Sequence, residues 1–204
     1  MKKLFTVSIL LIMMHIATFA QTVEITPFGG YVFASRWSGP NGSVRFDDAA
    51  MYGGSLSVGV NPVSNISFTY TRIDTKASPD YYGRFFEDVP LSQNYYMVGF
   101  TRNFPVNEHV SPFASINLGG VYFAPKESGY YNYWFFAMGA DAGAKIFFND
   151  VIGIRLQAQL MFPVQYGGFS FYFGSGGSGT SYTVSSTMVD FGFTGGLIFR
   201  LGKK

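Results

Sequence analysis

The chain has 204 residues, of which 48 % are hydrophobic, 19 % aromatic and 13 % charged, whereas about 25 % of the residues of a soluble domain are usually charged. Its 14 basic and 12 acidic residues nearly cancel, so nucleic-acid binding has no electrostatic support. The absence of cysteine excludes disulfides, cysteine chemistry and a lipid-modified N-terminal cysteine.

The first 20 residues have the pattern of a secretory signal peptide. Lys2 and Lys3 provide the positive start, residues 4–14 are mostly apolar, and a small-residue cleavage site ends at Ala20. Polar residues interrupt the apolar run, which is shorter than the roughly 20 residues that a membrane-spanning helix needs. We therefore predict cleavage after Ala20 and one mature domain over residues 21–204, because no linker divides it.

The rest of the chain shows no helical period but repeated alternation of apolar and polar residues, bounded by turn residues, as in β-strands. Eight such runs predict an antiparallel all-β fold, and they cover residues 22–34, 49–60, 65–75, 92–103, 110–124, 134–148, 152–163 and 187–201.

The connections between these runs alternate in length. Residues 61–64, 104–109 and 149–151 are short turns, whereas residues 35–48, 76–91, 125–133 and 164–186 are long loops. Short turns on one side and long loops on the other are the expected layout of an up-and-down transmembrane β-barrel, with both mature termini on the periplasmic side.

Alternation is clearest in the seventh run, where even-numbered residues from Ile152 to Phe162 are apolar and the intervening residues include Arg155, Gln157 and Gln159. Inward positions are odd-numbered in runs six and seven, so directly paired residues must have an even sum, which a three-residue turn at 149–151 satisfies.

The polar face decides which side looks outward. It consists mostly of Gly, Ser, Thr, Gln and Asn, which suit a narrow lumen better than a watery exterior. An eight-stranded barrel has an interior just wide enough for its side chains, where unpaired charges would lose their hydration. We therefore predict an interior salt-bridge network that plugs the barrel, made of Glu24, Asp141, Lys145, Arg155, Asp190 and Arg200. A soluble ligand-binding barrel, with the apolar face inward, remains the alternative.

Aromatic residues recur near the ends of the runs, where they would form the interfacial girdles of a barrel wall. They are Tyr31, Phe33, Tyr95, Tyr96, Tyr122, Phe123, residues 134–136, Phe147, Phe148 and Phe162.

The chain over about residues 22–201 resembles the small OmpA/OmpX-type outer-membrane barrel family of Gram-negative bacteria. The most specific element is residues 194–201, which resemble the C-terminal insertion signal through Thr194, Gly196, Phe199 and Leu201. The resemblance implies recognition by the barrel-assembly machinery and a surrounding of outer-membrane lipids and lipopolysaccharide. The chain departs from the commonest form of the signal because it continues through Gly202, Lys203 and Lys204.

The sequence offers little catalytic chemistry. Of its two histidines, His15 lies in the signal and His109 beside Glu108 in a short turn, and no third group completes a site. The glycine-rich residues 174–179 lack the lysine of a phosphate loop and are expected to be a flexible loop tip. Neither Asp47 with Asp48 nor Glu87 with Asp88 has the further spaced oxygen ligands of a metal site, so no metal or cofactor is expected.

Three classes of function remain, which we rank by how well the sequence supports them. A structural or surface-interaction role comes first, because the predicted loops are rich in aromatic residues that could bind an extracellular protein or glycan. A narrow porin-like conduit for ions or small apolar molecules comes second, and an enzyme is a distant third. The candidate binding residues in the loops are Trp37, Phe46, Tyr81, Tyr82, Phe85, Tyr130, Tyr131 and Tyr133.

Overall fold

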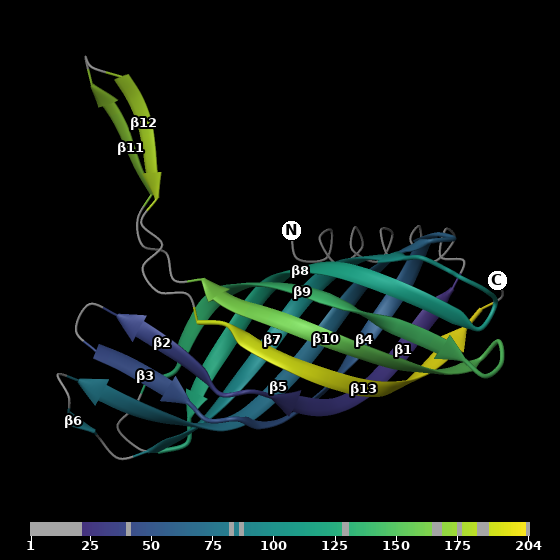
Figure 1. Ribbon diagram of the computed structural model, residues 1–204, viewed down its shortest axis with the longest axis horizontal. Coiled ribbons are helices and arrows are strands. Elements are labelled where there is room, and N and C mark those ends of the chain that lie inside the picture. The colour runs from purple at the N-terminus through teal and green to yellow at the C-terminus, as the bar shows by residue number, and fades with distance from the viewer. Residues whose placement is uncertain are drawn as a thin grey trace, which may run out of the picture.

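The computed structural model describes residues 22–39, 42–81, 84–85, 88–127, 131–164, 169–174, 177–182 and 188–202. Within these residues, eight antiparallel strands close into a barrel in up-and-down order, with the first strand paired to the last (Figure 1). The fold class and the strand number predicted from the sequence are confirmed. The barrel strands are β1 (Val23–Val32), β4 (Ala49–Asn61), β5 (Ser64–Tyr81), β7 (Val89–Asn103), β8 (Val110–Pro125), β9 (Tyr133–Phe147), β10 (Ile152–Val164) and β13 (Asp190–Leu201).

The long connections are not simple loops. β5 extends to Tyr81, beyond its predicted end at residue 75, and β7 begins at Val89, three residues before its predicted start. β3 (Gly42–Phe46) pairs with residues 77–81 of β5, past the part of β5 that pairs with β4. Its hairpin partner β2 (Ser35–Gly39) and the short β6 (Arg84–Phe85) widen this projecting sheet. The glycine-rich segment predicted to be a loop tip contributes to β12 (Gly177–Tyr182), which pairs with β11 (Phe169–Gly174) in a separate hairpin.

The barrel has two distinct ends, which we name by their connections. The turn end holds Thr22, Gly202 and the short connections at residues 62–63, 104–109 and 148–151, and the loop end holds the long connections (Figure 1). The predicted turn at residues 149–151 is confirmed: Asn149 Oδ1 accepts hydrogen bonds from the backbone N–H groups of Val151 and Ile152, and Phe147 pairs with Gly153.

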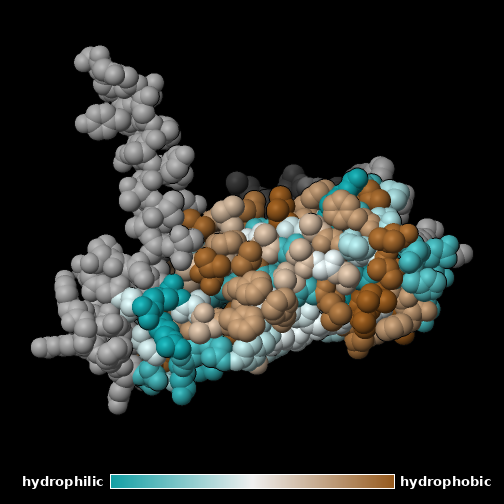
Figure 2. Space-filling view, in the orientation of Figure 1, coloured by the Kyte–Doolittle hydropathy of each residue, from teal (hydrophilic) through white to brown (hydrophobic). Residues whose placement is uncertain are grey.

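Burial alternates along each strand, as the sequence predicts. In β10, Arg155, Gln157 and Gln159 are buried, whereas Leu156 is exposed on the outside. Figure 2 shows hydrophobic side chains over much of the visible barrel wall, with hydrophilic residues gathered at its ends. The exposed apolar residues of this wall include Ile25, Leu56, Ile66, Phe68, Val98, Phe100, Ile116, Leu118, Met138, Leu156, Phe193, Leu197 and Phe199. Among the described residues, no helix is both long and apolar enough to cross a membrane.

Two inward glycines show how tightly the wall curves. A Cβ atom at Gly119 would overlap the carbonyl oxygen of Tyr96, and one at Gly143 would overlap that of Leu156. Glycine permits a close approach of neighbouring strands at such bends. The interior of this barrel therefore depends on residues without side chains as well as on the side chains that fill it.

Candidate functional site: the barrel interior

An ion triad occupies the interior near the turn end. Lys145 Nζ on β9 donates to Glu24 Oε2 on β1 at 2.6 Å, and Arg200 Nη2 on β13 donates to Glu24 Oε1 at 3.1 Å. The Arg200 guanidinium also lies 3.6 Å from the centre of the Phe147 ring. Because Glu24 and Lys145 are almost fully buried, both carboxylate oxygens depend on these two cations in place of water.

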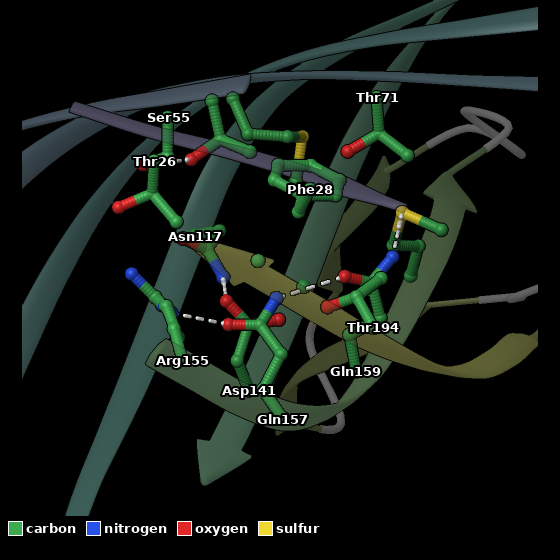
Figure 3. A pocket seen from close by; sticks show the side chains of 15 residues that line it. Thr26, Phe28, Ser55, Thr71, Asn117, Asp141, Arg155, Gln157, Gln159 and Thr194 are labelled. Carbon is green, nitrogen blue, oxygen red and sulfur yellow. Dashed lines mark hydrogen bonds between the residues drawn. The ribbon is translucent and has the colours of Figure 1, made fainter. Parts of the chain in front are cut away.

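A second polar group lies in the middle of the barrel (Figure 3). Arg155 Nε donates to Gln157 Oε1 at 2.6 Å, and Gln157 Nε2 donates to Gln159 Oε1 at 3.0 Å, so a ladder of side chains follows the inner face of β10. Asp141 accepts from Asn117 Nδ2 at 2.9 Å. Within the described residues no ion pair joins Arg155 to Asp141, so these two charges do not take part in the interior salt bridges that the sequence predicted.

The space beside this polar group is small. A cavity of about 30 Å³ is lined by Thr26, Asn117, Asp141, Arg155 and Thr194 among others. A single water needs roughly 10–15 Å³ of such volume, so the cavity has room for about two waters. It is a small gap between side chains and no wide channel.

Asp190 differs from the other interior charges. It is 2 % exposed near the loop end and accepts from Tyr95 Oη at 2.6 Å and from Ser35 Oγ at 2.7 Å. No cation pairs with it among the described residues, so the predicted salt bridge is replaced by two hydroxyl donors. All six predicted charges thus face the interior side of the wall, but only Glu24, Lys145 and Arg200 form ion pairs with one another.

The half of the interior toward the loop end is an apolar core, which the prediction of a mostly polar lumen missed. Its inward side chains pack into one buried cluster, with Val44 and Phe135 against its edge. The inner wall therefore changes from mostly polar to mostly apolar along the barrel axis, and Asp190 is a buried charge in the apolar half. The barrel strands contribute Met51, Ile73, Leu91, Tyr95, Met97, Val121, Phe123, Ala137 and Met161 to this cluster.

A vestibule of about 520 Å³ opens at the turn end. Asn61, Asn65, Asn103 and Ser111 contribute to its wall, and Glu24 and Arg200 of the ion triad line it as well. The triad therefore lies between this vestibule and the interior cavity, whose lining includes Thr26, two residues beyond Glu24 on β1.

Outside the barrel, four aromatic residues form an arc across β5, β7, β8 and β9. The ring of Tyr96 lies 5.2 Å from that of Tyr70 and 5.7 Å from that of Trp134, which is 5.0 Å from Tyr122. Tyr96, Tyr122 and Trp134 of this arc were predicted as girdle residues, whereas Tyr70 was not.

Four predicted girdle residues are wrong, because Tyr95, Phe123 and Phe147 are buried in the interior and Phe135 packs against the apolar core. Parity along each strand could have shown this, since only one of two consecutive aromatic residues can face outward.

An outward polar cluster lies next to the aromatic arc on its loop-end side. Asp74 accepts hydrogen bonds from Tyr52 Oη at 2.9 Å, Arg72 Nη2 at 3.1 Å and Ser92 Oγ at 2.6 Å, and it pairs with Lys126 Nζ at 2.9 Å. Charged groups thus begin where the apolar wall ends.

The residues predicted to bind a ligand through the loops differ in where the structure places them. Tyr131 is 78 % and Tyr133 55 % exposed, as a contact surface requires, whereas Phe46 is 7 % exposed and packs on Phe123, which corrects its place as a loop contact. Tyr82 and Tyr130 lie outside the described residues, as do the side chains of Trp37, Tyr81 and Phe85.

The residues of the insertion signal lie on β13 with alternating orientation. Thr194 is buried inside the barrel, whereas Phe199 and Leu201 are exposed on the outer wall near the turn end. Gly196 is on the inner face, where a Cβ atom would crowd the carbonyl oxygen of Pro27. His109 is exposed in its turn, and its backbone N–H donates to Asn107 Oδ1.

No protein-family model and no curated protein matches this chain. Its structure is similar to that of Neisserial surface protein A (TM-score 0.60, 9 % identity, 88 % of this chain and 97 % of that one). It is also similar to the outer membrane protein OprG from Pseudomonas aeruginosa (TM-score 0.61, 9 % identity, 90 % and 97 %). A third similar structure is the outer membrane protein AlkL in DMPC lipid bilayers (TM-score 0.53, 11 % identity, 90 % and 92 %). At these identities the likeness shows the fold, which is that of the small outer-membrane β-barrels.

Proposed function

We propose that the mature chain is an integral protein of the outer membrane with a structural or surface-interaction role and no enzymatic activity. The observation that carries this proposal is the distribution of side chains in the closed barrel, with apolar residues exposed on the outer wall and ion pairs buried inside. A soluble barrel would instead expose charges on its wall, and a lipid environment makes exposed apolar residues favourable.

The same proposal includes the export of the chain, its insertion and its orientation in the outer membrane. Residues 1–20 are the cleaved signal, and Thr194, Gly196, Phe199 and Leu201 serve as the signal read by the barrel-assembly machinery. The turn end and both mature termini face the periplasm, and the loop end faces outward. Outer-membrane lipids and lipopolysaccharide surround the apolar wall.

We further propose that the interior side chains plug the barrel. Glu24, Lys145 and Arg200 close it near the turn end, Arg155 and Asp141 fill the middle, and Asp190 lies below the projecting β2–β3 hairpin. The cavity of about 30 Å³ and the apolar core toward the loop end support a closed lumen. Surface interaction then depends on the loop end, where Tyr131 and Tyr133 are exposed for an extracellular protein or glycan.

The membrane location is tested first by migration of detergent-refolded protein on an SDS gel with and without heating. We expect a heat-dependent shift, because a closed barrel with lipid-facing walls resists SDS until heated. Solubility in plain buffer without such a shift would refute the proposal in favour of a soluble barrel.

The orientation is tested by labelling single cysteines, which the cysteine-free chain makes unambiguous. Tyr131→Cys at the loop end should react with a membrane-impermeant maleimide on intact cells, whereas Glu108→Cys at the turn end should react only after the outer membrane is opened. The reverse pattern would contradict the proposed orientation.

A narrow conduit is the second candidate. The vestibule of about 520 Å³ favours it, because this space gives ions access from the turn end to Glu24 and Arg200 of the triad. Its test is the permeability of liposomes that contain the purified protein. Ion flux above the lipid background, changed by Glu24→Gln or Arg155→Ala, would support a conduit. Background flux in the wild type and in both variants would support the plug.

A further inference from the structure

Arg36 and Arg45 are directly opposite each other in the β2–β3 pair, on the sheet that projects from the loop end. Arg45 lies between Val44 and Phe46, which both pack toward the apolar core, so its own side chain faces the outside. Directly paired residues share a face of a sheet, with Cβ atoms roughly 4.5–5.5 Å apart. Both arginines are exposed on this face.

This pair has weaker charge compensation than Arg72 and Lys126 have. Like charges directly opposite each other destabilise a strand pair. The nearest acid, Asp47, has its Oδ1 atom 3.9 Å from Arg45 Nε, with both side chains well exposed. The side chain of Arg36 has no hydrogen bond or ion pair with any described residue. By contrast, Arg72 and Lys126 share Asp74 at 2.9–3.1 Å.

The pair also stands well above the apolar wall. Arg45 pairs with Ser78, which is six residues along β5 from Arg72, and Arg72 belongs to the register row that continues through Asn94 and Tyr122 to Trp134 of the aromatic arc. Six residues of strand span about 20 Å, or about 15 Å of height at a tilt of about 40°. The polar layer of one phospholipid leaflet is only about 5–8 Å thick, so the pair reaches beyond phospholipid headgroups, to the height of membrane-linked saccharides.

We propose that Arg36 and Arg45 together bind a phosphate monoester carried by a saccharide above the membrane surface. The proposal rests on the proposed function, since it requires the loop end to face outward. The guanidinium fork matches phosphate geometry, and two such forks can hold one group from two sides. A phosphate monoester carries a charge of about −1.5 to −2 and so balances both arginines, whereas a sulfate ester or a carboxylate balances only one.

The test is calorimetric titration of the full mature chain, refolded in neutral detergent, with glucose 6-phosphate, glucose 6-sulfate and glucose. We expect saturable binding of glucose 6-phosphate, weaker binding of glucose 6-sulfate and none of glucose. Arg36→Gln and Arg45→Gln should each weaken the binding of glucose 6-phosphate by roughly tenfold, the effect of one charge-assisted hydrogen-bonding group. Arg102→Gln is the matched control, since it removes an exposed arginine near the turn end and should leave binding unchanged.

Equal binding by the wild type and both variants would overturn the proposal, as would an equal loss in Arg102→Gln, which would mean attraction by net charge only. A headgroup source is tested by repeating the titration in nanodiscs with and without phosphatidic acid. Loss of sugar-phosphate binding in the discs with phosphatidic acid would show that a lipid phosphate occupies the site, and it would overturn the proposal of a saccharide ligand. The heat-dependent gel shift of each sample separates this result from failure of the proposed function: a shift without sugar binding refutes the inference alone.

Discussion

Tyr95 and Asp190, 95 residues apart in the chain, meet inside the barrel through a hydrogen bond of 2.6 Å from the tyrosine hydroxyl to the carboxylate. Tyr95 is 0 % and Asp190 2 % exposed, and the second oxygen of the carboxylate is held by Ser35 of the projecting hairpin. This carboxylate is therefore satisfied by hydroxyl groups alone and links the barrel wall to the hairpin.

Replacing Tyr95 by Phe should destabilise the barrel by about 1–3 kcal/mol, the usual effect of leaving a buried polar group without its partner. Urea unfolding in lipid vesicles, followed by tryptophan fluorescence, measures the change. Tyr131→Phe is the matched control, since its ring is exposed, and should leave the free energy of unfolding unchanged. Equal stabilities of Tyr95→Phe and the wild type would show that the hydrogen bond contributes nothing.

Substitutions of the three ion-triad residues should lower the free energy of unfolding by unequal amounts. Glu24→Gln leaves Lys145 and Arg200 without their acid and should destabilise the protein by about 3–5 kcal/mol, the range for breaking a buried pair. Lys145→Met should have a smaller effect, because Arg200 still pairs with Glu24. The same urea titration decides the order, and a larger loss in Lys145→Met would mean that Arg200 contributes little to holding the carboxylate.

The outward position of Leu118 gives a test of the lipid-facing wall. Leu118 is 51 % exposed, and Leu118→Arg should destabilise the protein in vesicles by about 2–4 kcal/mol if it lies near the middle of the bilayer. Tyr131→Arg, at the loop end above the aromatic arc, should be nearly neutral. If Leu118→Arg were as stable as the wild type, its side chain would be facing water.

At Gly119, even one added carbon atom should prevent correct closure of the barrel. Gly119→Ala would place a Cβ atom against the Tyr96 carbonyl, so we expect a reduced yield of the form that shifts with heat on SDS gels. Gly54→Ala is the control, because an added Cβ there would be 4.0 Å from its nearest neighbour, the Thr26 carbonyl oxygen. Normal folding of Gly119→Ala would show that the strands can move apart at this bend.

The sequence was sufficient to predict the eight strands and the side of the wall on which each charge lies, because alternation is a local property. The pairing of Phe147 with Gly153 followed from parity and a short turn, both of which are read from neighbouring residues. The extension of β5 to Tyr81 was missed because β3 pairs with it from a distant part of the chain.

Parity assigns a face but no height along the barrel, and this limited the prediction of the site. It placed Asp141, Arg155 and Asp190 inside correctly, yet it could not show that Asp190 lies level with Tyr95 and Ser35 while Glu24 lies level with Arg200. Which interior charges meet depends on the shear of the whole barrel, a property of non-local strand register. The apolar core around Met51 and Ile73 was missed for a different reason, since residues without charge were not followed strand by strand.

The pairing of Glu24 with Arg200 also connects the electrostatics of the interior to closure of the barrel. Glu24 is the second residue of the first strand and Arg200 the second-last residue of the final strand, and the two are register partners across the closing seam. An incompletely assembled sheet would leave this carboxylate without Arg200, and the seam gains a charge pair only when the last strand docks on the first. The ion pair thereby favours the closed barrel over a shorter, open intermediate, because it links the first barrel strand to the last.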